Sequence, residues 1–297
     1  MINGIVNVRK EKGYTSHDVV AKLRGIIRQK KIGHTGTLDP DAVGVLPVCL
    51  GKATKLCDLI GGWDKSYEAV LLLGQTTDTE DCSGQILSRA PVNVTEEEIA
   101  EILRSFVGDY NQIPPMYSAK KVKGRKLYEL AREGIVIERK PCPVQIKSIH
   151  VKEINLPRVT FSVTCSKGTY IRSLCRDAGE QAGCGGCMEE LTRTRVADFH
   201  LTDSFTLEEI EAAREEGRLM DLVRPIDSVF MDYPAIPADP SYDKLLMNGN
   251  PIPAGDSLPV PPEDGDLVRV YNSRGLFIGV YRYDSPRKQL RPYKMFI

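Results

Sequence analysis

GHTGTLDPDAVGVLP, residues Gly33–Pro47, is the most unusual stretch of the chain. Its glycines allow another backbone or a ligand to approach closely, and Pro40 pushes Asp39 toward an extended conformation. A carboxylate in this position is ionised at neutral pH, since an unperturbed aspartate has a pKa of ~3.9. Asp39 is therefore a candidate nucleophile, base or metal ligand. The structural alternative is a turn that the Asp39 side chain caps.

The residues on either side of Asp39 indicate a helix and then a loop. The segment 15–31 is predicted to be a helix, capped by Thr15 or Ser16 and ended by Gly33. Its apolar residues recur at helical spacing: Val19, Val20, Leu23, Ile26 and Ile27. Residues 33–51 are rich in Gly and Pro and show no clear period, so we expect an extended, partly buried loop.

Strands and helices alternate irregularly further along the chain. The predicted elements are strands at 67–73, 144–151 and 158–165, helices behind the capping boxes Thr95–Glu98 and Thr206–Glu209, and a helix at 171–182 that Gly183 ends. The strands at 144–151 and 158–165 alternate apolar and polar residues, and we expect them to pair.

The composition changes near Met231, where a proline-rich stretch begins. Two strand patterns follow at 267–271 and 276–283, joined by Asn272–Gly275, which is a hairpin signal. We place a boundary near residue 232 and expect a small all-β domain of about sixty residues after it.

Overall composition is that of an ordinary globular protein, with 41% apolar and 27% charged residues among 297. No apolar run approaches the roughly 20 residues of a membrane helix, and the N-terminus lacks a secretory signal pattern. We therefore expect a cytoplasmic protein that does not contact a membrane. Net charge is zero, but basic residues cluster at 9–31, at 120–140 and near the C-terminus. These clusters indicate either a phosphate-binding face or solvated helix surface.

Several classes of site are disfavoured by the sequence. The eight cysteines are spread along the chain without a disulfide framework, and Cys184-x-x-Cys187 lacks a second ligand pair for zinc. The segment Gly51–Thr54 lacks both the spacing and the hydroxyl of a nucleotide-phosphate loop. A serine hydrolase is disfavoured because no Gly-x-Ser-x-Gly occurs.

Two further segments carry candidate functional residues. Arg172 falls in the first turn of a predicted helix, where the dipole disfavours a cation, so we expect a carboxylate or phosphate partner. The alternative is a surface arginine. The segment 112–128 interleaves prolines, aromatic residues and lysines, which suits an RNA backbone with splayed bases. Its alternative is a solvated basic loop that leads into a helix at 128–132.

Taken together, these segments resemble the TruB-type tRNA pseudouridine synthases. Five motifs carry the resemblance in order: Gly13–Asp18, Gly33–Pro47, Leu73–Gly74 with Thr77–Asp81, Ile113–Lys120, and Gly168–Arg172. The C-terminal part resembles a PUA domain through Asn248–Ile252 and Phe277–Val280. The resemblance therefore extends over essentially the whole chain.

The resemblance implies roles for individual residues. Asp39 matches the catalytic aspartate, Arg172 the arginine that pairs with it, and Tyr67 the tyrosine that stacks on the target base and is placed to take a proton. His34, Tyr170 and Leu191 match positions that line the pocket of the flipped nucleotide. The expected RNA contacts are Lys10, Thr35, Lys120, Lys121 and Lys123. The implied activity is conversion of a T-loop uridine of tRNA (position 55) to pseudouridine, by a monomer that needs no metal, cofactor or guide RNA.

The same resemblance implies an α+β fold. Residues 1–231 would form a pseudouridine synthase domain on a mixed, largely antiparallel sheet, with an RNA-gripping insertion at about 112–143. Residues 232–297 would form a small PUA-like β-barrel that holds the acceptor end. The sequence departs from the family pattern at Glu11, where we expect a proline, at Thr192, where the family often has a basic residue, and at Cys187, where it often has a histidine.

Two rival functions remain on the sequence alone. One is a non-catalytic RNA-binding or RNA-folding protein on the same scaffold, against which the intact Asp39, Tyr67 and Arg172 argue. The other is a guide-dependent enzyme for ribosomal RNA, which the short N-terminus and the compact segment after Tyr283 disfavour.

Overall fold

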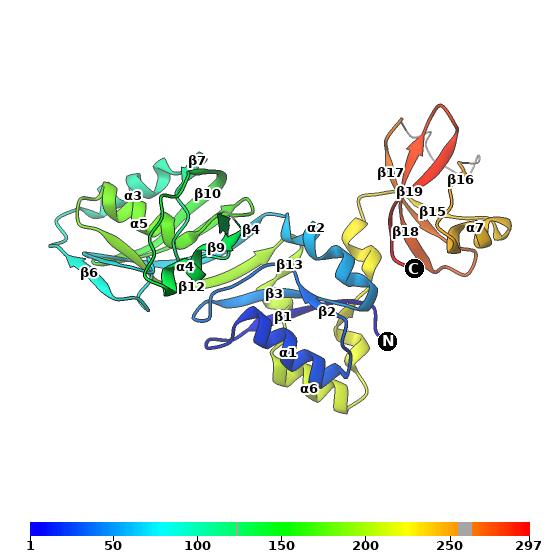
Figure 1. Cartoon of the computed structure of the whole chain (residues 1–297), viewed down its shortest axis with the longest axis horizontal. Coiled ribbons are helices and arrows are strands. Elements are labelled where there is room, and N and C mark those ends of the chain that lie inside the picture. Colours follow the sequence, from blue (N-terminus) through cyan, green and yellow to red (C-terminus); the bar gives the residue numbers. More distant parts are fainter. Residues whose placement is uncertain (123, 255–262) are drawn as a thin grey trace.

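The computed structural model describes residues 1–122, 124–254 and 263–297. Its largest feature is a long sheet, whose strands are β1 (Gly4–Lys10), β2 (Ile32–His34), β3 (Val43–Leu50), β4 (Lys65–Leu73), β7 (Gly108–Gln112), β10 (Cys142–Asn155), β11 (Arg158–Cys165), β12 (Gly186–Val196), β13 (Phe199–His200) and β14 (Val223–Arg224). Their order is β14-β1-β3-β12-β4-β11-β10-β7, with β2 beside β3 and β13 beside β12 (Figure 1). β12 runs parallel to β3 and antiparallel to β4. The predicted mixed, largely antiparallel sheet is confirmed.

Helices cover the two halves of this sheet separately. Helices α1 (Ser16–Ile27) and α6 (Leu207–Glu215) contact each other beside β1 and β3, and α3 (Glu96–Ser105) and α5 (Ile171–Gln181) cover the half built by β4, β10, β11 and β12 (Figure 1). The capping boxes at Thr95 and Thr206 begin α3 and α6, as predicted. Each half thus has its own apolar core, and the β3–β12 junction lies between them.

Two boundaries differ from the sequence prediction. Helix α1 ends at Ile27 instead of residue 31, because Arg28 adopts a left-handed conformation, with φ of 54°, that caps the helix. Eight residues of the expected loop at 33–51 form the buried strand β3. β3 lies between β1 and β12 and is buried from Gly44 to Leu50, so its residues do not alternate between polar and apolar.

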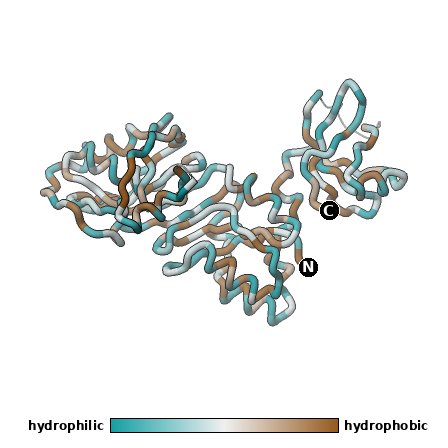
Figure 2. Tube along the Cα trace, in the orientation of Figure 1, coloured by the Kyte–Doolittle hydropathy of each residue, from teal (hydrophilic) through white to brown (hydrophobic). Residues whose placement is uncertain are grey.

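The C-terminal residues form a second, curled sheet. Its strands are β15 (Ala235–Pro237), β16 (Ile252–Pro253), β17 (Leu267–Tyr271), β18 (Phe277–Asp284) and β19 (Gln289–Met295), in the order β15-β17-β18-β19-β16, with helix α7 (Asp243–Met247) beside them. The predicted hairpin is β17–β18. Phe230 packs against Phe277 and Phe296 and joins this sheet to the rest, at one end of the elongated molecule (Figure 1). Apolar segments run through both sheets, and hydrophilic segments lie at the connecting loops (Figure 2).

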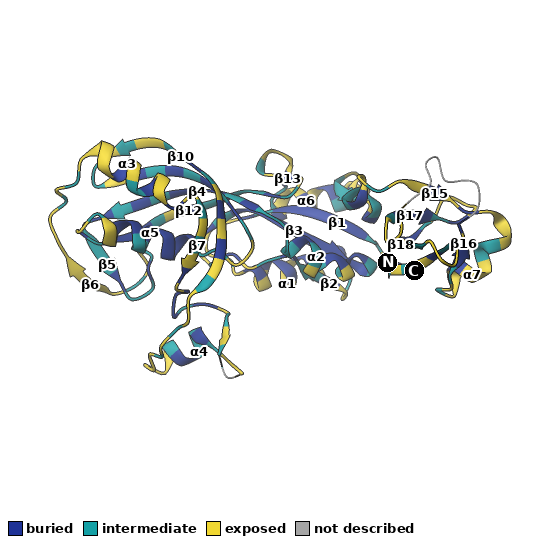
Figure 3. Cartoon of the chain, turned by 90° about the horizontal axis from the view of Figure 1, so that it is seen from above, coloured by how far each residue is buried: buried dark blue, intermediate teal, exposed yellow. Residues whose placement is uncertain are grey.

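An insertion leaves the long sheet between β7 and β10. It contains β8 (Lys121–Val122), β9 (Arg125–Lys126) and α4 (Leu127–Arg132), and it stands away from the main body (Figure 3). Met116, Leu127 and Leu130 give it a small core of its own. The other elements are β5 (Gln75–Thr77), β6 (Ile86–Arg89), α2 (Cys57–Gly61) and the 3-10 helices η1 (Gly51–Leu56), η2 (Leu201–Asp203), η3 (Leu219–Leu222), η4 (Ile226–Phe230) and η5 (Pro240–Tyr242). Within the described residues, none of the helices has the length and apolar character needed to cross a bilayer.

Candidate active site

Asp39 lies in the loop between β2 and β3, beside the β3–β12 junction. On one side of Asp39, the backbone N–H of Leu38 donates to Ser16 Oγ at 2.9 Å, and the Leu38 side chain is buried. On the other side, Lys10 Nζ donates to the carbonyl oxygens of Pro40, at 3.0 Å, and Ala42. The loop is thus fixed immediately before and after Asp39, whose side chain stays 39% exposed.

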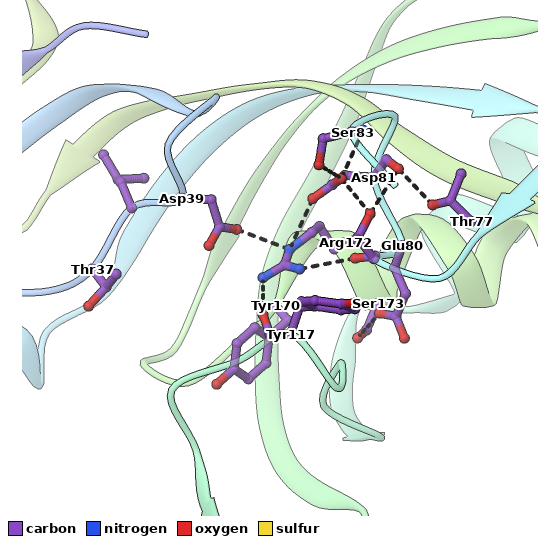
Figure 4. A network of polar contacts seen from close by, with 12 residues as sticks. Thr37, Asp39, Thr77, Glu80, Asp81, Ser83, Tyr117, Tyr170, Arg172 and Ser173 are labelled. Carbon is purple, nitrogen blue, oxygen red and sulfur yellow. Dashed lines mark hydrogen bonds and ion pairs between the residues drawn. The ribbon is translucent and has the colours of Figure 1, made fainter. Parts of the chain in front are cut away.

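Arg172 lies beside Asp39 at the start of α5. Its Nε is 3.0 Å from Asp39 Oδ2, and its Nη atoms donate to the carbonyls of Thr79, at 3.0 Å, and Tyr117, at 2.9 Å. Asp81 Oδ2 is 3.8 Å from the same Nε (Figure 4). The Arg172 side chain is only 5% exposed, so these groups fix the guanidinium while Asp39 keeps an open side. The carboxylate partner expected for Arg172 is therefore Asp39, with Asp81 behind it.

The pKa of Asp39 is raised above its ordinary value. Desolvation by the surrounding protein is the main cause, and the nearby Asp81 adds to it. The cations of Arg172 and Lys10 act in the opposite direction and favour the carboxylate. An ionised Asp39 in this site is consequently less well hydrated than a surface aspartate, which makes it a stronger base or nucleophile.

Tyr67 lies on β4, directly opposite Arg193 of β12. It is 7% exposed, and burial raises the pKa of its phenol to about 12. The phenol is therefore protonated at neutral pH. Leu191, two residues before Arg193 on β12, is also buried and packs in the same apolar core as Tyr67.

The remaining predicted pocket residues lie on both sides of the site. Tyr170 precedes α5, and Gln112 makes two hydrogen bonds to its backbone, accepting from N at 2.7 Å and donating to O at 2.9 Å. His34 on β2 is half-buried, and its ring meets that of His17 edge-on at 5.2 Å. Burial and the neighbouring His17 lower the pKa of His34, so its imidazole is neutral at physiological pH.

Charged side chains near Arg172 connect the Thr77–Asp81 segment with α5 and with the insertion. Glu80 is buried next to Asp81, accepts a hydrogen bond from Ser173 Oγ at 2.6 Å and pairs with Arg176. Arg139 of the insertion lies 4.0 Å from the same carboxylate. Glu80, Arg139 and Arg176 line a cavity of about 770 Å³ between the insertion, the β5–β6 hairpin and α5. Asp39 and Arg172 do not line this cavity, which therefore lies beside the Asp39 site on the side of the insertion.

Two expected RNA contacts are buried instead. Lys10 is 1% exposed, and its ammonium donates to the carbonyls of Glu11, Pro40 and Ala42. Thr35 is 4% exposed. In this structure Lys10 holds the backbone of the Asp39 loop and Thr35 belongs to the packed interior, so contact of either side chain with RNA stays a prediction.

The basic residues expected on the insertion differ in exposure. Lys121 is exposed on β8. Lys120 is partly buried, and its Nζ contacts Cys142 Sγ. Lys123 lies outside the described residues.

Among the residues that the structure describes, no group of three or more His, Cys, Asp or Glu side chains is placed to hold a metal ion. Cys184 and Cys187 are both buried, and Cys187 Sγ lies 3.6 Å from Cys82 Sγ.

Sequence reasoning missed two charged residues of this site. Asp81 belongs to the Thr77–Asp81 motif, but the spacing gave no sign that it lies behind Arg172. Arg193 is 1% exposed and reaches the Asp39 loop. Its only sequence signal is its position two residues after Leu191, on the same face of a strand.

Comparisons with known proteins identify the family of the chain. Residues 24–171 match the model of the TruB family pseudouridylate synthase (N terminal domain), and residues 172–231 match that of the tRNA pseudouridylate synthase B C-terminal domain. The chain is 50% identical to the tRNA pseudouridine synthase B of Lachnoclostridium phytofermentans over 100% of both chains. It is 42% identical to that of Stutzerimonas stutzeri, over 98% of this chain and 96% of the relative.

Solved structures share the fold along nearly the whole chain. A crystal structure of a Cbf5-Nop10-Gar1 complex contains a chain with a TM-score of 0.73 and 26% identity, over 99% of this chain and 85% of that one. An H/ACA RNP bound to a substrate RNA containing 2′-deoxyuridine gives a TM-score of 0.71 and 25% identity, with the same coverage.

Proposed function

The chain belongs to the TruB family of pseudouridylate synthases, and we propose that it converts a T-loop uridine of tRNA to pseudouridine with Asp39 as catalytic carboxylate. The observation that carries the proposal is the ion pair between the partly exposed Asp39 and the buried Arg172. The relatives named tRNA pseudouridine synthase B support tRNA as the substrate. The T-loop as target rests on the motif resemblance.

The reaction requires the target nucleotide to leave its stack. Extruding a base from a folded loop costs roughly a few kcal/mol, and stacking on an aromatic side chain returns about 1–3 kcal/mol per base. Tyr67, His34 and Tyr170 are the proposed aromatic contacts of the flipped nucleotide, and Leu191 is the proposed apolar one. Arg172 orients the Asp39 carboxylate on the ribose side of that nucleotide, and Ser16 and Lys10 fix the loop that carries it.

Asp39 then starts the exchange of the glycosidic bond. It either attacks C1′ of the ribose or removes the 2′ proton, and both routes use the ionised carboxylate. Arg172 keeps the carboxylate charged and oriented through a charge-assisted contact. The base detaches from C1′ through N1, rotates and rejoins through C5. Since substrate and product are isomers, no electrons are gained or lost.

The C5 proton must leave after the new bond forms. Tyr67 is the proposed acceptor by position, but its pKa of about 12 makes the free phenol a poor source of base at neutral pH. We therefore propose stacking as its main contribution, with proton transfer confined to the reacting complex.

The two sheets support an assignment of the chain to two domains that contact different parts of the tRNA. We propose that residues 1–231 form the catalytic domain, with the insertion at 112–143 gripping the stem-loop, and that residues 232–297 form a PUA-like domain for the acceptor end. We further propose a monomer that acts in the cytoplasm without guide RNA. Exposed basic groups on the insertion, such as Lys121 and Arg125, support its contact with phosphates.

One experiment separates this function from its rivals. The full chain is incubated with an unmodified T-arm stem-loop and no other RNA, and pseudouridine is mapped along the product. Conversion at a single T-loop uridine supports the proposal. Binding without conversion favours a non-catalytic RNA-binding protein, and conversion that requires an added guide RNA favours the guide-dependent class.

A further inference from the structure

Arg193 is among the largest completely buried side chains of the chain, with 1% of its surface exposed. Its Nε donates to the Val45 carbonyl at 2.7 Å. Its Nη atoms reach the carbonyls of Thr37, at 3.5 Å, and Gly36, at 3.4 Å. One guanidinium thus contacts both strand β3 and the part of the loop that immediately precedes Asp39.

The charge of Arg193 is not neutralised by an acid. In the described parts of the chain, no carboxylate forms an ion pair with Arg193, and the buried Lys65 is a second cation beside it: Lys65 Cε and Arg193 Nη1 lie 3.7 and 3.8 Å from the same Cβ position at Gly36. Burying an unpaired cation costs several kcal/mol, and an apolar side chain of similar volume often stabilises a fold better. The residue is therefore poorly explained by fold stability alone.

Its position on β12 places Arg193 between the strand that follows the Asp39 loop and the strand that carries Tyr67. Arg193 pairs with Gly44 of β3 on one side and with Tyr67 of β4 on the other. Lys10 holds the carbonyls of Pro40 and Ala42, on the far side of Asp39. Two buried cations therefore hold the loop, one before Asp39 and one after it, and only Arg193 also lies opposite Tyr67.

We propose that Arg193 is a positioning residue, which fixes the Gly36–Thr37 backbone relative to Tyr67 so that Asp39 meets the ribose while the base lies against the tyrosine. This inference rests on the proposed function and deepens it. Arg193 acts through the loop and the strand and does not touch the substrate. Its planar fork matters because three separate nitrogens contact the Val45, Thr37 and Gly36 carbonyls in a fixed geometry, which the flexible stem of a lysine does not reproduce.

The test compares Arg193→Met, Arg193→Lys and the control Arg195→Met in the full chain. Arg195 lies on the same strand, but its Nε donates to Ser66 Oγ at 3.2 Å and not to the loop. Single-turnover conversion of a T-arm stem-loop is measured beside the Kd for that RNA and the unfolding temperature. Displacing a reacting group by about 1 Å can cost about 100-fold in rate. We expect Arg193→Met to lose about that much, with RNA affinity within about threefold, and Arg193→Lys to recover part of the rate.

Each outcome decides the inference. A folded Arg193→Met with a rate within about threefold of wild type overturns it, and so does a rate loss that the weaker RNA affinity explains entirely. If Arg193→Met does not fold, Arg193→Lys decides: a folded variant with a slower rate and unchanged affinity supports positioning, whereas a wild-type rate or a second folding failure refutes it. If wild-type protein converts no uridine, the proposed function fails instead, because this comparison starts from an active enzyme.

Discussion

The Nε atom of Arg172 lies 3.0 Å from Oδ2 of Asp39, and the two remaining nitrogens of that guanidinium bind the carbonyls of Thr79 and Tyr117. The arginine is buried and fully engaged, whereas the carboxylate is partly open to solvent. The chain therefore presents an oriented, partly exposed acid and holds its counter-charge in the interior. This asymmetry is what a substrate-facing carboxylate requires.

Replacing the carboxylate tests its role directly. Asp39→Asn keeps the size of the side chain but cannot act as base or nucleophile, so we expect conversion to be abolished while RNA binding survives. Conversion is followed by tritium release from RNA labelled at C5 of uridine, and binding is measured by filter retention. Asp41→Asn, which changes an exposed acid two residues away, is the matched control and should stay active. Activity of Asp39→Asn within about tenfold of wild type would refute the catalytic role.

Arg172 should set the acid limit of activity. Asp39 works as the carboxylate, so the rate falls as pH drops through its pKa. Arg172 lowers that pKa against the effect of burial, and its removal should raise the pKa further. In Arg172→Met the rate should therefore begin to fall at a higher pH than in wild type.

The pH–rate profiles of the two proteins measure this shift under single-turnover conditions. Arg172→Lys keeps the charge and serves as control, with a smaller shift in the acid limit. A profile for Arg172→Met that loses height but keeps its acid midpoint would mean that Arg172 does not control the ionisation of Asp39.

Deprotonation of Lys10 should slow conversion at alkaline pH. Burial lowers its pKa to about 8, so its ammonium loses a proton as pH rises above that value. The neutral amine holds the Pro40 and Ala42 carbonyls less strongly, because a charge-assisted hydrogen bond is roughly twice as strong as a neutral one. We expect conversion to slow above about pH 8, and Lys10→Met to be slower below that pH and to lose this alkaline decline.

Lys65 provides the matched control, since burial lowers its pKa to about 8 as well, while its Nζ donates to Gly61 and Trp63 and not to the Asp39 loop. A decline that persists in Lys10→Met and disappears in Lys65→Met would assign the alkaline limit to Lys65.

The insertion should supply much of the salt-dependent affinity for RNA. Changing Lys120, Lys121 and Lys123 together to Ala should weaken tRNA binding and flatten the dependence of log Kd on log salt, by roughly 0.7–0.9 for each phosphate that these lysines neutralise in the wild-type complex. The control changes Lys147 and Lys152, whose partners are Asp64, immediately before β4, and Glu68 of β4. A triple variant with the wild-type salt slope would show that the insertion does not grip the phosphates.

Local signals predicted much of the fold. The capping boxes at Thr95 and Thr206 involve residues three apart, and both helices begin where expected. The errors arose where neighbouring elements decide. β3 is buried because β1 and β12 flank it, and the order of strands in a sheet is not visible in the residues of one strand. Arg28 ends α1 in a conformation that usually indicates glycine.

The site was predictable only in part for the same reason. Asp39 and Arg172 stand out through their own neighbours in sequence, and family resemblance linked them. Lys10 was expected to contact RNA, and the sequence did not indicate its burial, which depends on the loop that folds over it. Arg193 resembles any polar residue of an alternating strand until β12 is placed between β3 and β4.

The β3–β12 junction gives a final prediction, about stability. Gly44 has a φ of +107°, and a Cβ at this position would lie 2.2 Å from the Arg193 carbonyl oxygen and 2.9 Å from its nitrogen. Backbone strain of this kind costs about 1–3 kcal/mol, and the clash with backbone atoms cannot be relieved by a rotamer change. We expect Gly44→Ala to lower the free energy of unfolding by on the order of 3 kcal/mol or more and to displace Arg193.

Gly25→Ala is the control, because Gly25 lies within α1 with open space around its Cβ position. That change should stabilise the chain by about 0.5–1 kcal/mol. Urea unfolding of both variants measures the difference, and a Gly44→Ala protein as stable as Gly25→Ala would contradict the tight β3–β12 junction on which the geometry of the site depends.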